Sequence, residues 1–255
     1  MPSSLPTTIR DLHLRRGRER RRLTLAEGIR LIEEALSSRA EIEAAVIAPS
    51  LEHTPRGAAL IESLGSAGIR IERVSDKELE ALAETEQSQG IIAVVKLPEW
   101  SPANLDLAGR KAVIVLDGVQ DPGNAGTILR TALGLGAAGM IALPGSVEIA
   151  NPKVVRGSMG AAFRLPVLAI GHDELLGWLR QESVELLVAE VGGAPIQSIK
   201  PVGPVALVLG NEGAGVSPAL KSAGRAVGIA LPGGAESLNV AVAAGILLYE
   251  VMRER

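Results

Sequence analysis

Residues 112–130 read AVIVLDGVQDPGNAGTILR, an apolar run followed by a turn signal and then by helical spacing. Residues 112–116 are apolar without a break, as expected for a strand buried on both faces of a parallel sheet. Asp121-Pro122-Gly123 predicts a turn, and Asn124 is placed to cap a helix over about 124–135. The stretch therefore predicts the strand, turn and helix of an α/β protein.

The same alternation continues toward the C-terminus. Further apolar runs predict strands at 140–143, 186–189, 205–209 and 227–230. Helices are predicted near 173–182 and 217–222, and from about 238 onward. This order predicts an α/β domain with a mostly parallel sheet.

The N-terminal part of the chain also alternates between predicted helices and predicted strands. Thr24 followed by Glu27 predicts a capping box that opens a helix over about 24–37, and Ser75 with Glu78 predicts a second capping box. Strands are predicted at 44–48, 69–74 and 91–95, and a helix near 56–67. Residues 97–104 carry two prolines and no periodicity. We therefore divide the chain into domains at 1–96 and 107–255, joined by a linker over 97–106.

Composition narrows the class of function. With 255 residues, the chain exceeds the usual size of one domain. Aromatic residues make up only 2%, which excludes a broad stacking platform for bases. There is no cysteine, and His13, His53 and His172 lack metal-ligand spacing, so no metal is expected. No secretory signal or bilayer-length apolar run is present, so we expect a cytoplasmic protein without a membrane partner.

Charge is unevenly distributed along a chain whose net charge is −3. Arginines crowd into eight residues with only Glu19 against them: Arg15, Arg16, Arg18, Arg20, Arg21 and Arg22. Such a run is either a solvated terminal arm or a contact surface for a nucleic-acid backbone, and we favour the second interpretation. Any nucleic-acid contact must use arginine, lysine and backbone groups, because aromatic residues are so scarce.

Polar and glycine-rich segments follow three of the predicted strands, at the strand ends where open α/β sheets bind ligands. The first segment, 117–130, runs into the predicted helix over 124–135. On that helix, the side opposite the apolar face is expected to carry Gly126, Thr127, Arg130 and Gly134. Arg130 either contacts an anion or is a solvated surface residue, and spacing alone does not decide between them. The second segment, 207–217, reads LVLGNEGAGVS, and the third, 231–239, reads LPGGAESLN with Ser237 as a candidate N-cap. Neither is a Walker A loop or a dinucleotide fingerprint.

The final helix is apolar nearly all round, from Val240 to Tyr249. A helix without a polar face must be buried, either in the core or against a second subunit. This pattern favours a homodimer.

Together, in this order and spacing, three motifs resemble the signature of the SpoU/TrmH family of RNA ribose 2′-O-methyltransferases, in the SPOUT superfamily. They are Asp-Pro-Gly-Asn-x-Gly-x-x-x-Arg at 121–130, Leu-Gly-Asn-Glu-Gly at 209–213 and Ser-Leu-Asn-Val-Ala at 237–241. Residues 22–34 and 89–93 resemble the ribosomal-protein-like substrate-binding domain of that family. Residues 151–166 resemble members that act on large-subunit ribosomal RNA, and Arg156 in this run is a candidate RNA contact.

The resemblance implies a deep trefoil knot in the C-terminal domain, a homodimer, and transfer of a methyl group from S-adenosylmethionine to a ribose 2′-hydroxyl, with 23S rRNA favoured over tRNA. It places the cofactor against Leu209, Gly210, Asn211, Gly213, Ile229, Leu231, Ser237 and Leu238. The family's active-site positions match Asn124, Arg130, Glu212, Ser237 and Asn239.

Family proposals cast the matching arginine as general base. A guanidinium stays protonated in proteins and has no acceptor atom until it loses a proton, so we expect Arg130 to act as a clamp on the ribose and its phosphate. Asn124 and Ser237 would orient the hydroxyl, and Glu212 and Asn239 would support the site. Two other classes stay open: a non-catalytic RNA-binding protein of the same fold, and a nucleotide-dependent dehydrogenase, which the missing fingerprint disfavours.

Overall fold

The computed structural model describes residues 4–85, 88–108 and 111–253 and separates the chain into two compact units. The N-terminal unit comprises Met1–Glu99 together with Ala150–Arg164, and the C-terminal unit comprises Trp100–Ile149 and Leu165–Arg255. The boundary at Glu99 and Trp100 lies inside the predicted linker. Residues 150–164 lie between two strands of the C-terminal unit in sequence, yet they pack with the N-terminal unit.

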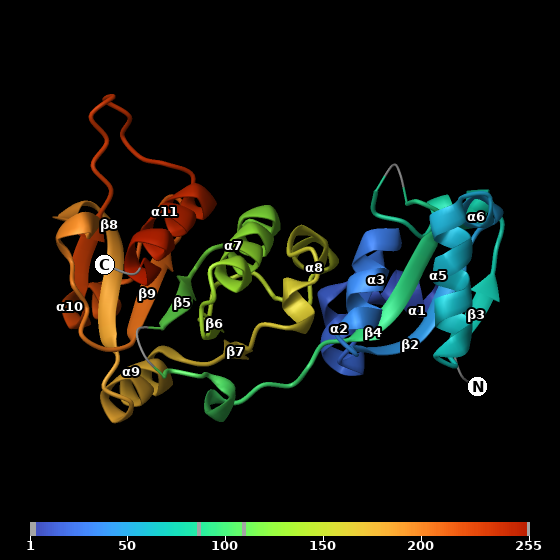
Figure 1. The fold of residues 1–255 in the computed structure, drawn as a ribbon, viewed down its shortest axis with the longest axis horizontal. Coiled ribbons are helices and arrows are strands. Elements are labelled where there is room, and N and C mark those ends of the chain that lie inside the picture. Colours follow the sequence, from blue (N-terminus) through green and yellow to red (C-terminus); the bar gives the residue numbers. More distant parts are fainter. Residues whose placement is uncertain (1–3, 86–87, 109–110, 254–255) are drawn as a thin grey trace. The chain divides into compact units, whose positions relative to one another are not determined.

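The N-terminal unit is built on a four-stranded sheet in the order β1-β4-β2-β3 (Figure 1). Its strands are β1 (Thr24–Glu27), β2 (Glu41–Ile47), β3 (Arg70–Arg73) and β4 (Ile91–Lys96). Strands β1 and β2 run antiparallel to β4, and β3 runs parallel to β2. The helices are α1 (Leu5–Leu12), α2 (Arg15–Arg21), α3 (Ile29–Ser37), α4 (Pro49–Glu52), α5 (Pro55–Ser66) and α6 (Asp76–Glu80).

Alternate residues of β4 point into two separate cores. Ile91, Ala93 and Val95 pack in the core that contains residues of α3 and α5. Ile92 and Val94 pack in the core that contains residues of α1 and α6. Both faces of the strand are therefore buried, which explains why it is apolar without alternation.

The predicted helix over 24–37 is wrong in its first part, because Thr24–Glu27 forms β1 and α3 begins at Ile29. The Thr24 hydroxyl donates to the carbonyl of Ala150 at 2.6 Å, and the Glu27 carboxylate accepts the backbone N–H of Glu84 at 3.1 Å. Gly28, with φ of 95°, ends the strand, and Gln89 Oε1 accepts the N–H of Ile29 at 2.9 Å. The second predicted capping box, Ser75 with Glu78, is confirmed.

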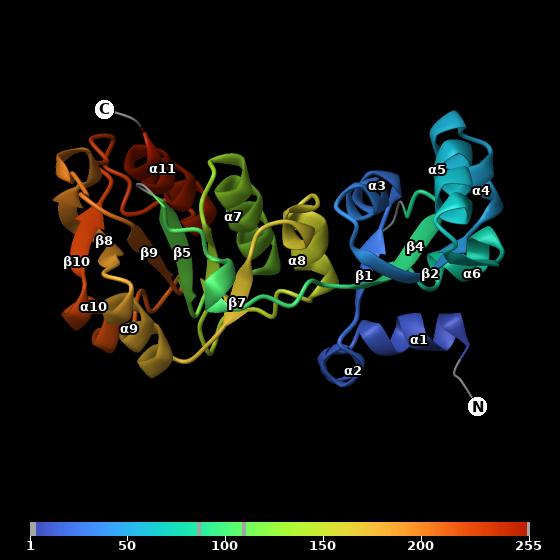
Figure 2. The same ribbon diagram turned by 60° about the horizontal axis from the view of Figure 1, so that its bottom comes forward.

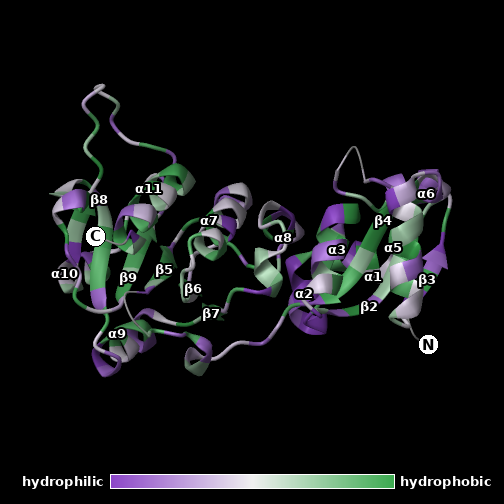
Figure 3. Ribbon diagram, viewed as in Figure 1, coloured by the Kyte–Doolittle hydropathy of each residue, from purple (hydrophilic) through white to green (hydrophobic). Residues whose placement is uncertain are grey.

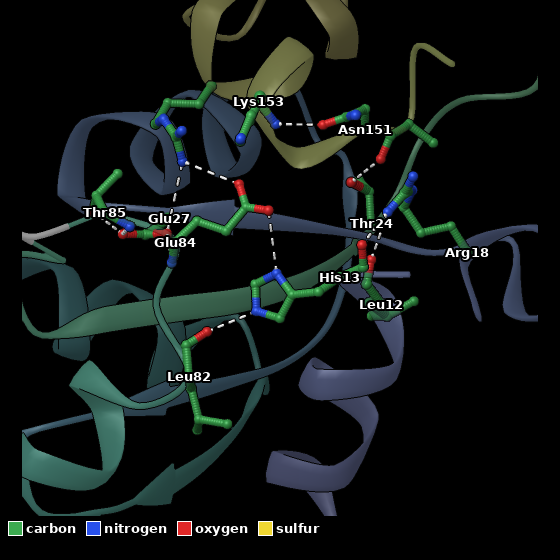
Figure 4. A network of polar contacts seen from close by, with 12 residues as sticks. Leu12, His13, Arg18, Thr24, Glu27, Leu82, Glu84, Thr85, Asn151 and Lys153 are labelled. Atoms are coloured by element: carbon green, nitrogen blue, oxygen red, sulfur yellow. Dashed lines mark hydrogen bonds and ion pairs between the residues drawn. The ribbon is translucent and has the colours of Figure 1, made fainter. Parts of the chain in front are cut away.

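Residues 150–164 form α8 (Pro152–Gly157) and the short 3-10 helix η2 (Ala161–Phe163). Val155 and Phe163 are buried in the same core as Leu31 and Ile32 of α3. Figure 4 shows the polar contacts nearby, in which the Thr24 hydroxyl bonds to this segment. The segment therefore completes the apolar core of the N-terminal unit.

This packing predicts a large stability effect for Phe163, which is 3% exposed. Replacing Phe163 by Ala should lower the free energy of unfolding by about 3–5 kcal/mol, because it removes a buried ring and leaves a cavity. Urea denaturation followed by circular dichroism measures this change. Leu14→Ala is the control, since Leu14 is 48% exposed and should cost little. A Phe163 variant as stable as the wild type would contradict the packing.

The C-terminal unit contains a parallel six-stranded sheet in the order β10-β8-β9-β5-β6-β7. Its strands are β5 (Ala112–Asp117), β6 (Gly139–Ala142), β7 (Val167–Ala169), β8 (Glu185–Pro195), β9 (Val205–Gly210) and β10 (Arg225–Gly228). The predicted parallel α/β sheet is confirmed, and β7 is an additional edge strand that sequence reasoning missed. Figure 3 shows β9 as predominantly hydrophobic, in contrast to the hydrophilic α2 of the N-terminal unit.

Helices cover both faces of this sheet: α7 (Pro122–Gly134), α9 (His172–Gln181), α10 (Pro218–Ala223) and α11 (Val240–Met252). Leu175 of α9 and Leu220 of α10 pack in one core with Val113 and Val115 of β5. Helix α11 packs against α7, β5 and β9 (Figure 2). A short 3-10 helix, η1 (Pro102–Asn104), lies in the predicted linker, and a third, η3 (Ile196–Ser198), follows β8.

Two predicted helix caps are wrong. Asp121, not Asn124, caps α7, because its Oδ1 accepts the backbone N–H of Asn124 at 2.7 Å. Asn239, not Ser237, caps α11, since its Oδ1 accepts the N–H groups of Ala241 and Val242. Both asparagine side chains nonetheless have polar roles, described below.

Candidate functional site

Three loops meet at the carboxyl end of the parallel sheet in the C-terminal unit. The first loop, residues 117–124, follows β5; the second loop, residues 210–217, follows β9; and the third loop, residues 229–239, follows β10. Strands β5 and β9 are neighbours, with Asp117 opposite Gly210. The sheet topology therefore brings together segments that are far apart in the sequence.

A chain of side-chain hydrogen bonds links one residue of each loop. Asn239 Nδ2 donates to Asn124 Oδ1 at 3.0 Å, and Asn124 Nδ2 donates to Glu212 Oε1 at 2.9 Å. The carboxylate can only accept, so it orients the Asn124 amide, which in turn orients the amide of Asn239. These three residues, which we call the amide–carboxylate chain, are at least partly exposed. A substrate can therefore reach them.

A cleft of about 650 Å³ opens beside this chain. All the residues predicted to hold the cofactor line it: Leu209, Gly210, Asn211, Gly213, Ile229, Leu231, Ser237 and Leu238. Glu212 and Asn239 line it as well, and Asn124 is hydrogen-bonded to both of them. The volume is in the range typical of small-molecule sites.

The second loop is held in a tight, preformed shape. Asn211 Oδ1 accepts the N–H groups of Gly213 and Ala214, both at 2.9 Å, and Asn211 and Gly215 form an isolated antiparallel bridge. At Gly210 a Cβ would overlap the backbone of Gly215 and Val216. Only glycine fits at this position, because the two ends of the loop approach each other so closely.

Sequence reasoning missed several residues that line the cleft. They include Glu190 in the middle of β8 and Lys221 on α10, whose Nζ lies 2.6 Å from the Glu190 carboxylate. Ala243 and Leu247 of α11 add an apolar wall. Glu190 directly follows the predicted strand at 186–189, which is the position where a ligand-binding residue is expected. Nothing in the neighbouring sequence, however, distinguishes it from a surface glutamate.

Arg130 is exposed on α7 and is not among the residues that line the cleft. Thr127 and Gly134 share its exposed face, as predicted, whereas Gly126 is buried. The structure thus brings Asn124, Glu212, Ser237 and Asn239 to the cleft or its edge, but leaves Arg130 on the helix surface.

The arginine run forms helix α2 instead of a terminal arm. Arg18 is only 5% exposed and donates to the carbonyls of Leu12 and His13, both at 2.9 Å. Its prediction as an RNA contact is therefore corrected: this side chain is part of the protein interior. The network around it is drawn in Figure 4.

The other arginines of the run differ in their surroundings. Arg20 and Arg21 both donate to Asp11, and hydrogen bonds from Arg21 and Arg20 hold the pKa of the Asp11 carboxyl below its usual value. Arg15 pairs with Glu19 at 2.7 Å, and Arg22 lies 3.6 Å from Glu99. Arg16 is exposed.

Arg156 of α8 is half-buried and lies 3.7 Å from Glu27 and 3.8 Å from Glu84. Over 4–85, 88–108 and 111–253, no group of three or more metal-ligating side chains is present. In the same residues, no helix is long and apolar enough to span a membrane.

Comparison with known proteins agrees with this geometry. Residues 111–249 match the SpoU rRNA Methylase family, and residues 7–93 match the MRM3-like substrate binding domain. The 23S rRNA (guanosine(2553)-2′-O)-methyltransferase RlmP of Bacillus subtilis is 35% identical, over 95% of this chain and 93% of that protein.

Two solved structures align with nearly the whole chain. An AdoMet-bound rRNA methyltransferase from Sinorhizobium meliloti has a TM-score of 0.84 and 28% identity, covering 98% of this chain and 95% of that one. The SpoU methyltransferase AviRb from Streptomyces viridochromogenes, in complex with AdoMet, has a TM-score of 0.86 and 26% identity, covering 98% and 97%. The chain described here belongs to the SpoU rRNA methylase family.

Proposed function

We propose that this protein transfers a methyl group from S-adenosylmethionine to a ribose 2′-hydroxyl of 23S rRNA in the cytoplasm. The observation that carries the proposal is the cleft lined by the second and third loops, with Glu212 and Asn239 of the amide–carboxylate chain in its wall. The full-length similarity to RlmP supports 23S rRNA as the substrate.

The residues of the cleft fit such a cofactor. S-adenosylmethionine combines a flat aromatic adenine and a ribose with a sulfonium, an ammonium and a carboxylate. The cleft offers apolar walls at Leu209 and Leu247, carboxylates at Glu190 and Glu212, and an ammonium at Lys221. When bound, the cofactor supplies an electrophilic methyl group on its sulfonium. Leu209, Gly210, Asn211, Gly213, Ile229, Leu231, Ser237 and Leu238 would hold it.

The protein then has to position the ribose and accept developing negative charge. Asn124 and Ser237 would orient the 2′-hydroxyl, while Glu212 and Asn239 fix the orientation of the Asn124 amide through the amide–carboxylate chain. Arg130 would bind the ribose oxygen and its phosphate through the two parallel N–H groups of its guanidinium. The hydroxyl proton would leave to water or phosphate, since Arg130 offers no acceptor.

The homodimer remains part of the proposal. Val242 is 51% exposed, Ile246 36% and Tyr249 53%, and these residues share one face of α11 by their helical spacing. An apolar stripe of this kind is typical of a surface that a second copy covers. Light scattering after size-exclusion chromatography should give twice the chain mass for the wild type and the single mass for Val242→Asp. A monomeric wild type would contradict the proposed dimer.

The trefoil knot and the domain division also remain proposals. We propose an RNA-binding domain over 1–96, a linker over 97–106 and a knotted methyltransferase domain over 107–255. Residues 150–164 of that last range pack on the N-terminal unit and would stabilise it. An experimental structure with an unthreaded chain over 205–255 would contradict the knot.

Contacts to RNA are proposed for the exposed Arg15, Arg16, Arg20 and Arg22 of the arginine run and for the half-buried Arg21 and Arg156. Replacing Arg16 by Ala should weaken binding of a 23S rRNA fragment and reduce the slope of log affinity against log salt by about 0.7–0.9, the value for one lost phosphate contact. Filter binding at several salt concentrations measures this slope. Arg180→Ala, an exposed arginine of α9, is the control. An unchanged slope for Arg16→Ala would remove it from the contact surface.

Mapping of ribose methylation in cells with and without the gene tests the proposed function. Loss of one 2′-O-methyl group from 23S rRNA, restored by the wild-type gene, is the expected result. Loss from a tRNA would correct the substrate, and an unchanged map would indicate a non-catalytic RNA-binding protein. Identification of the bound cofactor by mass spectrometry separates methyl transfer from dehydrogenase chemistry.

A further inference from the structure

Asp117 is a buried carboxylate that lies outside the cleft. It is the last residue of β5, is only 6% exposed and does not line the cleft. Its Oδ2 accepts the backbone N–H of Ser217 at 2.7 Å, and its Oδ1 lies 3.0 Å from Nε2 of His172. A buried carboxylate is costly unless donors surround it, and these two donors satisfy both oxygens. Since the carboxylate only accepts, Nε2 of His172 carries the proton.

These hydrogen bonds connect three elements of the C-terminal unit. Asp117 ends β5, His172 is the first residue of α9, and Ser217 immediately precedes α10. Ser217 also closes the second loop, whose neighbouring residue Val216 lines the cleft, and α10 carries Lys221 of the cleft wall. The position of Asp117 therefore determines where the far end of the second loop lies.

The near end of the same loop is tied to the residue next to Asp117. Asn211 Nδ2 donates to the carbonyl of Gly118 at 2.9 Å. Both ends of the second loop are thus anchored on two consecutive residues of the first loop. The first loop continues to Asn124 of the amide–carboxylate chain. The backbone of the first loop therefore supports both the second loop and that chain.

The anchor at Ser217 depends on its main-chain N–H and not on its hydroxyl. Ser217 makes no side-chain capping bond to α10, and its buried Oγ has no hydrogen-bond partner among the residues that the structure describes. The carboxylate of Asp117 accordingly supplies the side-chain hydrogen bond that holds this end of the loop. This separation allows the two groups of Ser217 to be tested independently.

We propose that Asp117 is a positioning residue that holds the second loop in the shape that binds the cofactor, with His172 keeping its carboxylate in place. The inference rests on the proposed function, because the consequence is measured on S-adenosylmethionine. It adds two residues outside the cleft to those that determine cofactor affinity. Neither of them touches the reacting atoms.

The test is Asp117→Asn in the full-length protein. The amide keeps the shape but removes the negative charge, and its NH2 group replaces one acceptor oxygen, so the charge-assisted bonds to the Ser217 N–H and to His172 are weakened or lost. Isothermal titration calorimetry should show about tenfold weaker binding of S-adenosylmethionine, with kcat at saturating cofactor within about twofold of the wild type. Hydrogen exchange of the cofactor-free protein should be faster over residues 211–220.

Matched controls separate this role from general destabilisation. Asp173→Asn changes the exposed carboxylate next to His172, and Ser217→Ala keeps the N–H that Asp117 binds. Both should bind cofactor like the wild type. His172→Gln retains an amide donor for Asp117 and should stay close to the wild type, whereas His172→Leu should weaken cofactor binding and loosen residues 211–220.

Unchanged affinity and unchanged exchange in both Asp117→Asn and His172→Leu would overturn the inference. So would a lower kcat with unchanged affinity in Asp117→Asn, which indicates a smaller folded fraction and only a structural role. If Asp117→Asn does not fold, the pair of His172 variants still decides. A folded wild type that binds no S-adenosylmethionine would overturn the proposed function itself. The titration of the wild type alone shows this, so the two failures can be distinguished.

Discussion

Replacing Gly210 by Ala is expected to abolish binding of S-adenosylmethionine, with at least about a hundredfold loss of affinity. The added Cβ would lie 2.6 Å from the carbonyl oxygen of Gly215 and would overlap the backbone of Gly215 and Val216. Backbone atoms cannot rotate away as a flexible side chain does, so the second loop has to open. The opened loop would no longer present Asn211–Gly215 to the cleft.

Isothermal titration calorimetry of the full-length protein measures this loss. Gly203→Ala is the matched control, because a Cβ at Gly203 meets nothing within 4 Å. Circular dichroism should show that both variants keep their secondary structure, since Gly210 is the last residue of β9 and most of the strand is unaffected. Wild-type affinity in Gly210→Ala would mean that the second loop does not form the cofactor site.

Replacing Arg130 by Lys is expected to lower kcat by about a hundredfold or more, and replacing it by Ala should lower kcat at least as far. Lysine keeps the positive charge but loses the planar pair of N–H donors that grips a phosphate or a developing alkoxide. Affinity for S-adenosylmethionine should not change, because Arg130 is exposed and does not line the cleft. The combination of lost turnover and retained cofactor binding distinguishes a substrate clamp from a cofactor ligand.

Single-turnover methylation of a 23S rRNA fragment with radiolabelled cofactor measures this effect. Arg180→Lys tests whether loss of any exposed guanidinium slows the reaction, and it should leave kcat unchanged. Full turnover in Arg130→Lys would exclude the bidentate clamp. Weaker cofactor binding in either Arg130 variant would instead place the guanidinium at the cofactor.

Much of the C-terminal unit could be predicted because its signals are local. A strand that is buried on both faces must be apolar throughout, as Ala112–Leu116 is, and parallel strands collect their carboxyl ends at one edge. The residues that the family resemblance assigned to the cofactor all line the cleft. They lie there because their loops follow strands of the parallel sheet, and the order of strands and loops could be predicted from the sequence pattern.

Hydrogen-bonding side chains were harder to predict, since the same group can serve a local or a distant partner. Thr24 and Glu27 match a capping box, but their acceptors and donors are backbone groups of Ala150 and Glu84. Arg18 looks like its neighbours in the arginine run, yet it is buried against the carbonyls of Leu12 and His13. Only the folded chain decides which partner is within reach.

Periodicity, together with the glycine and polar residues at strand ends, was enough to predict the parallel α/β unit and the three loops at the sheet edge. The tertiary structure alone decided that residues 150–164 complete the N-terminal core and that Glu190 and Lys221 join the cleft. It also brought the Asp117 carboxylate to the backbone N–H of Ser217 at the end of the second loop. Such contacts join residues that are distant in sequence, and these residues come close to one another only when the sheets have formed.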